Sequence, residues 1–463
     1  MAMLHNNTPP RELWLSCGAL ILSSTLVLLL ASSTAEAHPP SGDGDCQHYR
    51  FELTHINANL SLSSDELMRH AYERSRLRAA TLYGTGADSP AGGGGSSDSD
   101  SDSDSGSPVG PPGYLRQGDS VYNIEFYMDD LPGQVISATI DTGSNLIWTT
   151  QEQCQVSKTR SIVPCKSFTC KQQTNRECSS GQTRCKYEIT YGGDKGTETR
   201  GILYKDKITF LISRRPRKER TFQDITIGCS TYVSDPSIKG IVGLGRGAQS
   251  LPGQLNFDKF SYCLNSYYKP KLPSYLLLTA APDMSAGATS GAALATTGLR
   301  RNDAHKNRYY VDLQGISIGG TRLDVPVKSG GNMFVDTGSS FTHLEGSVFD
   351  KLVKALDQIM NGTQYSNKKQ DKNGMICYLA STIVHAEESS DVLPQMVLHF
   401  ADSADMVLPS DSYFWKTSKL CLAISKTEGN ISVLGNFQMQ GIHMLFDTQN
   451  DKLSFVPANC SEV

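Results

Sequence analysis

The stretch SATIDTGSNLIWTT, residues 137 to 150, places the tripeptide Asp141-Thr142-Gly143 between two apolar runs. Asp-Thr-Gly is ordinary turn chemistry, because Asp hydrogen-bonds its own backbone and Gly accepts a positive φ. Taken alone, the stretch fits a surface hairpin as well as half of a catalytic site, since strand–turn–strand patterns with these residues are common. A second copy elsewhere in the chain would favour the catalytic interpretation.

The second copy is GGNMFVDTGSSFTHL, residues 330 to 344, in which an apolar run again leads into Asp-Thr-Gly-Ser. About a hundred residues after each Asp, the chain carries two apolar residues and a glycine, at Ile241-Val242-Gly243 and at Val433-Leu434-Gly435. Two loops and two partner strands in the same order predict two related lobes. If these lobes pack about a pseudo-twofold axis, Asp141 and Asp336 meet where the lobes join.

Two carboxylates that lie close together cannot both ionise easily, because like-charge repulsion splits their titration. One carboxylate then acts as base on a water molecule between them, and its protonated partner donates to a scissile carbonyl. The residues that flank each Asp form matched pairs that suit this chemistry. In each loop, the backbone of a glycine can donate to the carboxylate, and a serine hydroxyl can hydrogen-bond its outer oxygen. A threonine in each loop can hold the two loops together. These pairs are Gly143 and Gly338, Ser144 and Ser339, and Thr142 and Thr337.

The composition sets broad limits on the fold and the partners. A chain of 463 residues is too long for one hydrophobic core, and its formal net charge of -4 does not suggest a nucleic-acid partner. After Tyr122, short runs of alternating β-branched and aromatic residues predict all-β lobes. An apolar stripe at helical spacing predicts a helix over residues 345–360. The basic run at residues 214–220 predicts a solvated hairpin loop, with a partner site as the alternative.

The N-terminus has the organisation of a secretory signal peptide. Arg11 precedes an apolar stretch at residues 13–31, and Ala35-Glu36-Ala37 suits signal peptidase, so we expect cleavage after Ala37. The apolar stretch is long enough to leave a signal anchor as the alternative. No other apolar run approaches membrane length, so we expect no membrane association after cleavage. Secretion also fits the sequons at Asn361 and Asn430, where we expect glycosylation.

Residues 38–91 have the character of a pro-segment. From Tyr49 to about Ala80 the sequence is helix-friendly and basic, and residues 92–113 form a Gly/Ser/Asp-rich linker that cannot bury enough apolar area to fold. A basic helix joined to a large domain by such a linker, behind a signal peptide, predicts a zymogen. We expect the basic residues between Arg69 and Arg78 to cover an acidic cleft until low pH weakens the attraction. A small accessory helix is the alternative.

The cysteines indicate disulfides in an oxidising compartment. Of twelve, Cys17 lies in the signal peptide and Cys46 just after it, which leaves an even ten from Cys154 onward. Their spacing alone does not fix the pairing, and the absence of histidines near the cysteines between Cys165 and Cys185 disfavours zinc. The chain has no His-Glu-x-x-His motif, so we expect no metal and no cofactor. We expect structural or surface roles for the scattered histidines His305, His343, His385, His399 and His443.

Beyond these inferences, the chain resembles the pepsin-like aspartic peptidases, and most of all their plant nepenthesin-like branch. The resemblance spans roughly residues 120 to 460 and rests on a specific set of motifs: DTGSNLIW, VDTGSS, ITYGGDKGTETRG, IGC, GIVGLGRGAQSLPGQL, FSYC, YYVDLQGISIGG and SVLGNFQMQGIHMLFDTQNDKLSFVPANC. The stretch YRFELTHINANLS is similar to the start of the pro-segment in that branch. Two Asp carboxylates that share one proton are a general property of aspartic peptidases.

The resemblance implies roles for individual residues. Tyr191 corresponds to the tyrosine of the flap, a hairpin that closes over substrate, with a core strand tyrosine as the alternative. Trp148 corresponds to the tryptophan that bonds this tyrosine. The flap tip, residues 192–196, reads Gly-Gly-Asp-Lys-Gly instead of the commoner Gly-Asp-Gly-Ser, which bears on flap behaviour and substrate preference. The implied disulfides are Cys154–Cys229, Cys165–Cys185, Cys170–Cys178, Cys263–Cys460 and Cys377–Cys421.

Together these observations predict a mainly β protein with the bilobal pepsin-like aspartic protease fold, two related β-barrel-like lobes with a cleft between them. We expect a signal peptide at residues 1–37, a pro-segment at 38–91, a linker at 92–113, an N-terminal lobe at 114–298 and a C-terminal lobe at 299–463. The expected function is a secreted aspartic endopeptidase, made as a zymogen. We expect it to act at acidic pH on protein or peptide substrates, as a monomer, in the apoplast or the vacuole.

The alternative is a catalytically silent binding or inhibitor protein on the same fold, as in the xylanase-inhibitor relatives. Such relatives typically lose a catalytic aspartate or its surroundings. Both Asp-Thr-Gly-Ser loops are complete in this chain, at Asp141 and Asp336, which favours the enzyme.

Overall fold

The computed structural model describes residues 48–58, 63–83, 121–129, 134–155, 157–173, 176–178, 181, 183–191, 197–361, 363–370, 374–380, 393–416, 419–427 and 429–463. The predicted signal peptide (residues 1–37), the linker (92–113) and the flap tip (192–196) lie outside these residues and remain predictions. The predicted lobe boundaries also remain predictions. None of the helices that the structure describes is long and apolar enough to cross a membrane.

The described elements are mostly strands, as the alternating pattern predicts. The strands are β1 (His48–His55), β2 (Tyr122–Met128), β3 (Ile136–Asp141), β4 (Ile147–Thr150), β5 (Ser161–Ile162), β6 (Arg176–Glu177), β7 (Lys186–Tyr191), β8 (Thr197–Arg214), β9 (Arg217–Val233), β10 (Gly240–Gly243), β11 (Lys259–Cys263), β12 (Ser274–Thr279), β13 (Ala295–Gly298), β14 (Tyr310–Val311), β15 (Leu313–Ile318), β16 (Thr321–Asp324), β17 (Met333–Asp336), β18 (Thr342–Glu345), β19 (Asn367–Gln370), β20 (Ile376–Leu379), β21 (Met396–Phe400), β22 (Ala404–Leu408), β23 (Phe414–Lys416), β24 (Lys419–Leu422), β25 (Ile424–Thr427), β26 (Ser432–Gly435), β27 (Ile442–Asp447) and β28 (Lys452–Pro457). The helices are α1 (Ser64–Tyr83), α2 (Gln151–Cys154), α3 (Phe168–Lys171), α4 (Leu251–Gln254) and α5 (Gly346–Met360), with 3-10 helices η2 (Ala401–Ser403), η3 (Ser410–Ser412) and η4 (Asn436–Met439).

Two local predictions are confirmed. Helix α5 forms where the apolar stripe predicts a helix, and Glu345 caps its start by accepting from Ser347 N at 3.1 Å. The hairpin predicted at the basic run is present between β8 and β9, but its turn is only Arg215 and Pro216, because residues 217–220 already belong to β9 and pair with β8.

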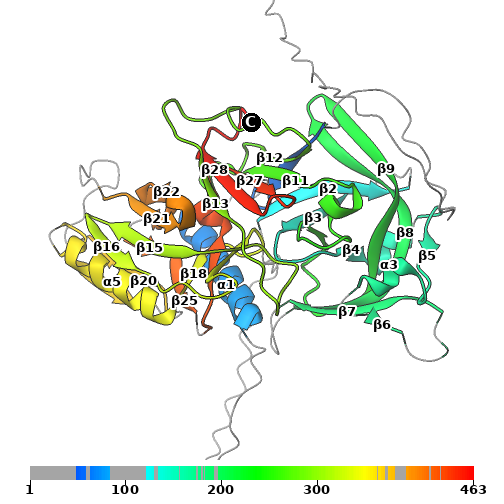
Figure 1. Cartoon of the computed structure of the whole chain (residues 1–463), viewed down its shortest axis with the longest axis horizontal. Helices are drawn as coiled ribbons and strands as arrows, with labels where there is room; N and C mark the ends of the chain where they lie inside the picture. Colours follow the sequence, from blue (N-terminus) through cyan, green and yellow to red (C-terminus); the bar gives the residue numbers. More distant parts are fainter. Residues whose placement is uncertain are drawn as a thin grey trace, which may run out of the picture. The chain divides into compact units, whose positions relative to one another are not determined.

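The described strands form four sheets. The largest runs in the order β13-β28-β27-β11-β12-β1-β2-β3-β10-β4-β9-β8-β7-β6, with β5 beside β8. The smaller sheets are β14-β17-β26-β18-β25, β16-β15-β21-β22 and β19-β20-β24-β23. Strands β27 and β28 (red in Figure 1) come from the end of the chain, and β27 pairs with β11 over Lys259–Cys263. The largest sheet therefore links both halves of the chain.

Strand β1 occupies an interior position in the largest sheet. It pairs antiparallel with β12 on one side and with β2 on the other. Its sequence HYRFELTH alternates, so that Phe51 and Leu53 are fully buried while Arg50 and Glu52 are half-buried. The helix-friendly interpretation of this segment is therefore wrong for residues 49–55, because two neighbouring strands offer pairing partners that local propensity does not reveal. It is right for α1.

The two Asp-Thr-Gly loops have the same strand surroundings. β3 ends at Asp141 and runs parallel to β10, with Asp141 opposite Gly243. β17 ends at Asp336 and runs parallel to β26, with Asp336 opposite Gly435. The strands that follow the loops, β4 and β18, pair antiparallel with the same partners. The structure thus confirms the internal repeat that the sequence predicts.

Gly243 and Gly435 are required because the Asp loops pass directly over them. A Cβ atom on Gly243 would lie 2.3 Å from the backbone carbonyl carbon of Asn145. A Cβ atom on Gly435 would lie 2.3 Å from the corresponding atom of Phe341. These distances are far inside van der Waals contact, so any side chain at either position would displace an Asp loop.

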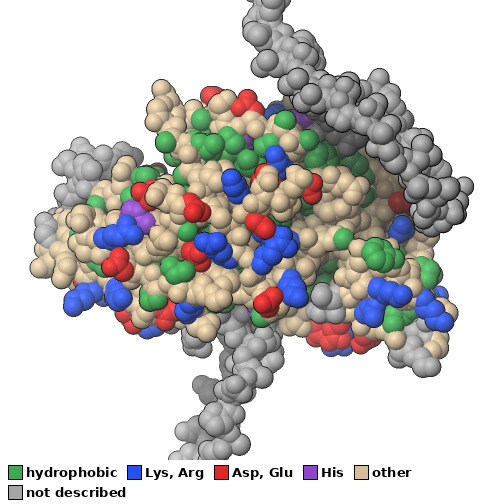
Figure 2. Space-filling model, in the orientation of Figure 1, with side chains coloured by type: hydrophobic (Ala, Val, Ile, Leu, Met, Phe, Trp, Pro, Cys, Tyr) green, Lys and Arg blue, Asp and Glu red, His purple; other side chains and the backbone are tan. Residues whose placement is uncertain are grey.

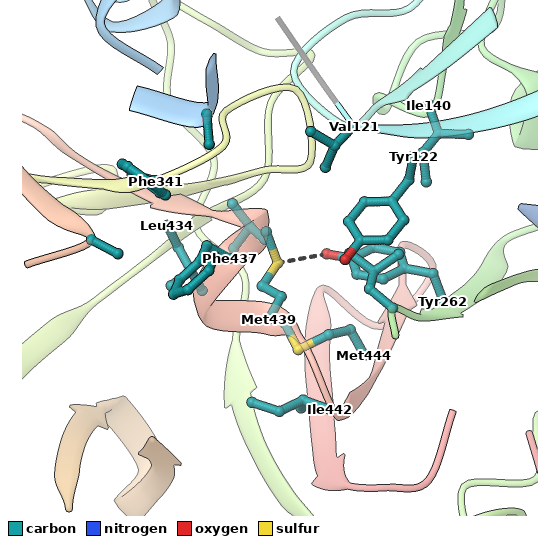
Figure 3. Close-up of a cluster of buried hydrophobic side chains, with 14 of the residues drawn as sticks. Val121, Tyr122, Ile140, Tyr262, Phe341, Leu434, Phe437, Met439, Ile442 and Met444 are labelled. Atoms are coloured by element: carbon teal, nitrogen blue, oxygen red, sulfur yellow. Dashed lines mark hydrogen bonds between the residues drawn. The ribbon is translucent and has the colours of Figure 1, made fainter. Parts of the chain in front are cut away.

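A buried hydrophobic cluster joins side chains from both halves of the chain (Figure 3), among them Ile140 and Leu434. Within it, the Tyr262 hydroxyl donates to Met439 Sδ at 2.9 Å. Burial, reinforced by the charge of Asp336, raises the pKa of Tyr262 well above its usual value, so this hydroxyl remains a donor. On the surface, the face drawn in Figure 2 carries interspersed charges of both signs, in keeping with the small net charge.

Candidate active site

The two Asp loops are held together by a reciprocal pair of threonines. Thr337 Oγ1 accepts from Thr142 N at 3.0 Å, and Thr142 Oγ1 accepts from Thr337 N at 3.0 Å. Each hydroxyl also donates across the junction, Thr142 to Val335 O at 2.9 Å and Thr337 to Ile140 O at 3.0 Å. Both threonines are buried. These four bonds hold the two loops as a pseudo-symmetric pair.

The two carboxylates have matching hydrogen bonds. Asp141 Oδ1 accepts from Gly143 N at 2.9 Å, and Asp141 Oδ2 accepts from Ser144 Oγ at 2.6 Å. Asp141 and Asp336 are 1% and 0% exposed. Hydrogen bonds to the charged form favour ionisation, so these donors allow a buried carboxylate to carry charge. The corresponding bonds in the second loop are Gly338 N to Asp336 Oδ1 at 3.0 Å and Ser339 Oγ to Asp336 Oδ2 at 2.6 Å.

Tyr191 and Trp148 lie together on the N-terminal side of the site. Tyr191 ends β7, the strand that leads into the flap tip, and its hydroxyl accepts from Trp148 Nε1 at 2.9 Å. Both side chains are buried in one hydrophobic cluster, so the indole N–H has the partner that a buried tryptophan needs. Tyr187 of the same strand lies in the same cluster, and its hydroxyl lies 2.7 Å from Ser230 Oγ.

Helix α1 packs on the chain that leaves the Asp336 loop. Ser75 Oγ accepts from Phe341 N at 2.8 Å and lies 2.8 Å from His343 Nε2. The ring of Tyr72 lies 6.4 Å from that of Phe341, and α1 also contacts β7. Sequence reasoning singled out the basic residues of this helix and missed Ser75, because its partners lie 266 and 268 residues further along the chain.

Asn436 is a second residue that sequence reasoning missed. Its side-chain nitrogen donates to Thr337 O at 2.9 Å, and its backbone N–H donates to Ser339 O at 2.8 Å. In the first half, Leu244 occupies the position equivalent to Asn436, and its backbone N–H donates to Asp141 O at 2.8 Å. The position directly after each apolar-apolar-Gly tripeptide is the signal that could have found these contacts.

Three of the five predicted disulfides are confirmed: Cys154–Cys229, Cys263–Cys460 and Cys377–Cys421. They connect residues that are 75, 197 and 44 positions apart. The longest of them ties β11 to the end of the chain, across the sheet that both halves share.

The other two predicted pairs are wrong, because the four cysteines exchange partners. The structure pairs Cys165 with Cys178 and Cys170 with Cys185. Cys170 and Cys185 are both fully buried in the hydrophobic cluster around Trp148, whereas Cys178 lies outside that cluster. Cys170 Sγ is nevertheless only 3.5 Å from Cys178 Sγ, so the sulfur atoms of both possible pairings lie close together. The spacing of the cysteines in the sequence could not distinguish between the two pairings.

The remaining predicted sites lie apart from the Asp loops. Within the described part of the chain, the sulfur atoms of Cys165, Cys170 and Cys178 lie within 4.8 Å of one another, but all three are in disulfides and offer no thiolate to a metal. Asn361 and Asn430, the predicted glycosylation sites, are both exposed. His385 lies outside the described residues.

A duplicated Asp loop crossing a parallel strand pair in each half defines a pepsin-like fold. Comparison with known proteins agrees with this assignment. A family model described as xylanase inhibitor N-terminal matches residues 122–278, and one described as xylanase inhibitor C-terminal matches residues 308–457. The chain belongs to the pepsin-like aspartic peptidase family, in its plant nepenthesin-like branch.

Curated relatives support the same branch. Aspartic proteinase nepenthesin-1 of Nepenthes gracilis is 27% identical over 438 residues, which cover 89% of this chain and 90% of the relative. Aspartyl protease 37 of Oryza sativa subsp. japonica is 28% identical over 494 residues, covering 94% and 98%. These relatives are named as aspartic proteases.

Solved structures support the fold alone. Conglutin gamma from lupine seeds matches with a TM-score of 0.59 at 15% identity, covering 73% of this chain and 93% of its own. Basic 7S globulin from soybean matches with a TM-score of 0.57 at 17% identity, covering 73% and 92%.

Proposed function

We propose that this chain is an aspartic endopeptidase whose catalytic pair is Asp141 and Asp336. The observation that carries the proposal is the reciprocal threonine lock, which supports a fixed relation between two buried carboxylates on matching loops. Two carboxylates in such a site share one proton, because repulsion disfavours the doubly ionised state. The need for that proton is the reason to expect activity at acidic pH.

In the proposed reaction, the ionised carboxylate takes a proton from a water molecule held between the pair. The water oxygen attacks the carbonyl carbon of the scissile bond, while the protonated carboxyl donates its proton to the carbonyl oxygen. The tetrahedral intermediate then breaks at the C–N bond as the leaving nitrogen takes up a proton. Ser144 and Ser339 keep both carboxylates oriented, and closure of the Tyr191 flap excludes water from the field of the pair.

We further propose that the protein is made as a zymogen in which α1 covers the active site. Support comes from its contacts on both sides of the site, with β7 next to the flap and with Phe341 and His343 beyond the Asp336 loop. Among the basic residues of the helix, Arg69 is exposed and Arg74 is buried. Acid-induced cleavage in the linker would then free the cleft for protein or peptide substrates.

The proposal includes secretion behind the predicted signal peptide, to the apoplast or the vacuole, as a monomer. Disulfides at ten of the described cysteines support an oxidising compartment.

The test is secreted expression of the full chain, incubation at acidic pH, N-terminal sequencing of the product, and peptide cleavage with and without pepstatin. We expect self-cleavage between Ala80 and Ser120, followed by pepstatin-sensitive hydrolysis. Asp141→Asn or Asp336→Asn removes one half of the proton-sharing pair, so we expect hydrolysis to fall by roughly 10²- to 10⁴-fold. Undiminished hydrolysis in either variant would refute the catalytic pair.

Asp324 offers a matched control for these variants. Its side chain is 91% exposed, so Asp324→Asn makes the same chemical change without touching the buried pair. We expect unchanged hydrolysis in this variant.

A binding or inhibitor protein on the same fold is the second candidate. The description of both matching family models as xylanase inhibitor domains favours it. The complete Asp-Thr-Gly-Ser loops favour the enzyme instead. Tight binding of a xylanase by the full chain, without any pepstatin-sensitive cleavage, would decide for the inhibitor.

A further inference from the structure

We propose that the Cys-rich segment, residues 154–186, is a docking surface for a linear acidic polysaccharide. The segment carries seven Lys and Arg residues and one acidic residue, Glu177, so its formal net charge is +6. The whole chain has a formal net charge of -4, so positive charge is concentrated in this small part of it. The segment lies outside the two Asp loops, and the proposal goes beyond the proposed function because binding of a polysaccharide needs no peptide hydrolysis.

Disulfides bring the basic residues of the Cys-rich segment together. Four of these residues directly adjoin a bridged cysteine in the sequence: Lys166, Lys171, Arg184 and Lys186. The bridge Cys170–Cys185 holds its two Cα atoms 5.8 Å apart, which places Lys171 beside residues 184–186. Pro164 pairs with Arg184 in a β-bridge, which brings the chain near Lys166 against the same residues. Like charges held this close repel one another, and a polyanion would relieve that repulsion.

Most of these basic side chains are open to solvent and unbalanced by acidic neighbours. Five are exposed: Lys158, Lys166, Lys171, Arg176 and Arg184. None of the five has an ion-pair partner among the residues that the structure describes. The single acid of the segment, Glu177, lies opposite Lys186 in the ladder of β6 and β7. The exposed ammonium and guanidinium groups are therefore available to the carboxylates of a partner.

Phe168 adds an apolar contact among these charges. It lies between Lys166 and Lys171 in the sequence and is 75% exposed. Cys170 of the same short helix α3 is fully buried, and Gln249 Nε2 donates to Thr169 O at 2.9 Å, so α3 is fixed to the body of the protein. Figure 2 shows apolar and basic side chains together in the region where Figure 1 labels α3. The face of an exposed aromatic ring attracts the C–H groups of a sugar ring.

These features favour an acidic polysaccharide over a membrane or a nucleic acid. Ile162 and Phe168 are the exposed large apolar residues in the described part of the segment, and α3 spans four residues, too few for an amphipathic helix that lies in a bilayer surface. The disulfides indicate an oxidising compartment, which argues against a nucleic-acid partner. A linear chain of acidic sugars offers both carboxylates for the basic residues and ring faces for Phe168.

The test measures binding of the full chain at neutral pH to polygalacturonate, a linear polysaccharide with one carboxylate on each sugar. The methyl ester of the same polymer is the matched neutral probe. We expect the chain to bind polygalacturonate and not the ester. We expect this binding to weaken as the salt concentration rises from about 0.05 M to about 0.5 M, because salt screens the charges. Absence of binding at low salt, or equal binding of the ester, would overturn the proposal.

Two variants locate the binding on the Cys-rich segment. Lys166→Gln combined with Lys171→Gln removes two exposed charges, so we expect the affinity for polygalacturonate to fall by about 5- to 20-fold. Phe168→Ala removes the exposed ring, so we expect a fall of about 3- to 10-fold. Unchanged affinity in either variant would contradict the proposed surface.

Lys269→Gln combined with Lys271→Gln is the matched control. Both lysines are exposed in the loop between β11 and β12, next to Leu272, which is 39% exposed. This control makes the same change in net charge as the lysine variant of the Cys-rich segment. We expect it to leave the affinity unchanged, and an equal loss would show that binding follows net charge alone.

Two further probes represent the rival partners. They are vesicles of phosphatidylcholine with phosphatidylserine, and polyglutamate with the same number of carboxylates as the polygalacturonate. We expect both to bind more weakly than polygalacturonate, because neither offers a sugar ring to Phe168. Tighter binding of either probe would overturn the assignment to a polysaccharide. None of these measurements requires peptide hydrolysis, so failure of this proposal and failure of the proposed peptidase are separately visible.

Discussion

Two tyrosines of strand β7, at the proposed flap, bond different partners through their hydroxyls: Tyr191 bonds Trp148 and Tyr187 bonds Ser230. Tyr191→Phe removes the acceptor of Trp148 Nε1 and leaves a buried indole N–H without that bond. Such a bond is worth about 0.5–1.5 kcal/mol, so we expect kcat/KM for peptide cleavage to fall roughly 2- to 10-fold. The reason is that a flap held in place by this bond closes over substrate less readily without it.

Tyr187→Phe is the matched control for the flap variant, because it removes a buried hydroxyl that bonds Ser230 instead. We expect Tyr187→Phe to lower the melting temperature and to leave kcat/KM unchanged. An equal kinetic loss in both variants would contradict a special role for Tyr191.

Contacts that a short motif, the internal repeat or the family resemblance encodes were predictable, and isolated contacts between distant residues were not. Gly143 and Ser144 donate to Asp141 across two and three positions, and a short motif encodes such spacing directly. Ser75 meets His343 across 268 positions, and no local pattern marks that contact. The exchanged cysteine pairs failed for a different reason: the structure joins residues only 13 and 15 positions apart, and four neighbouring sulfur atoms permit more than one connectivity.

At the scale of elements, strand β26 lies too close to the second Asp loop to carry a side chain at Gly435. Gly435→Ala places a Cβ atom 2.3 Å from the Phe341 carbonyl carbon, and main chain cannot yield as a flexible side chain can. Overpacking typically costs about 1–3 kcal/mol and occasionally more, so we expect the free energy of unfolding to fall by at least about 3 kcal/mol. Urea unfolding of the secreted protein measures this loss.

Gly298→Ala supplies the comparison for that variant, because the nearest atom to its Cβ would be 3.5 Å away, at the end of β13. We expect its free energy of unfolding to stay within about 0.5 kcal/mol of the parent. A similar loss in both variants would show that the close approach at Gly435 does not matter.

Residues 48–83 illustrate where element prediction succeeds and fails. Helix α1 was predictable from local composition, because its residues favour a helix wherever they pack. Strand β1 was not recognised, although HYRFELTH alternates, because its identity as a strand depends on pairing with β2 and β12. These strands lie about 70 and 220 residues further along the chain.

At the scale of the whole molecule, the disulfide Cys263–Cys460 closes the longest loop among the described bridges, with a sequence separation of 197. Removing it by Cys263→Ala with Cys460→Ala frees the unfolded chain most, so we expect a loss of about 5 kcal/mol in unfolding free energy. The corresponding loss for the Cys377–Cys421 bridge, with a separation of 44, is expected to be about 4 kcal/mol. The reverse order in urea unfolding would contradict this account of the bridges.

The architecture of the whole molecule was predictable because the chain contains two copies of the motifs that define it. The repeated Asp-Thr-Gly-Ser word and its apolar-apolar-Gly partner carry the arrangement of both halves, and the structure pairs them as the repeat predicts. The sharing of one sheet between β11 and β27 was not predictable, since it joins strands that have no counterpart pattern in sequence. The way in which the two halves of the chain share this sheet therefore had to come from the structure.

The central claim is that Asp141 and Asp336 act as one proton-sharing pair. The pH dependence of kcat/KM for a peptide substrate, measured on the acid-processed enzyme, tests this most directly. A shared proton predicts a bell-shaped pH profile with an acidic optimum, in which both limbs report the titration of the pair. We expect Asp336→Asn to abolish this profile. A rate that keeps rising to neutral pH, or that persists in Asp336→Asn, would contradict the claim.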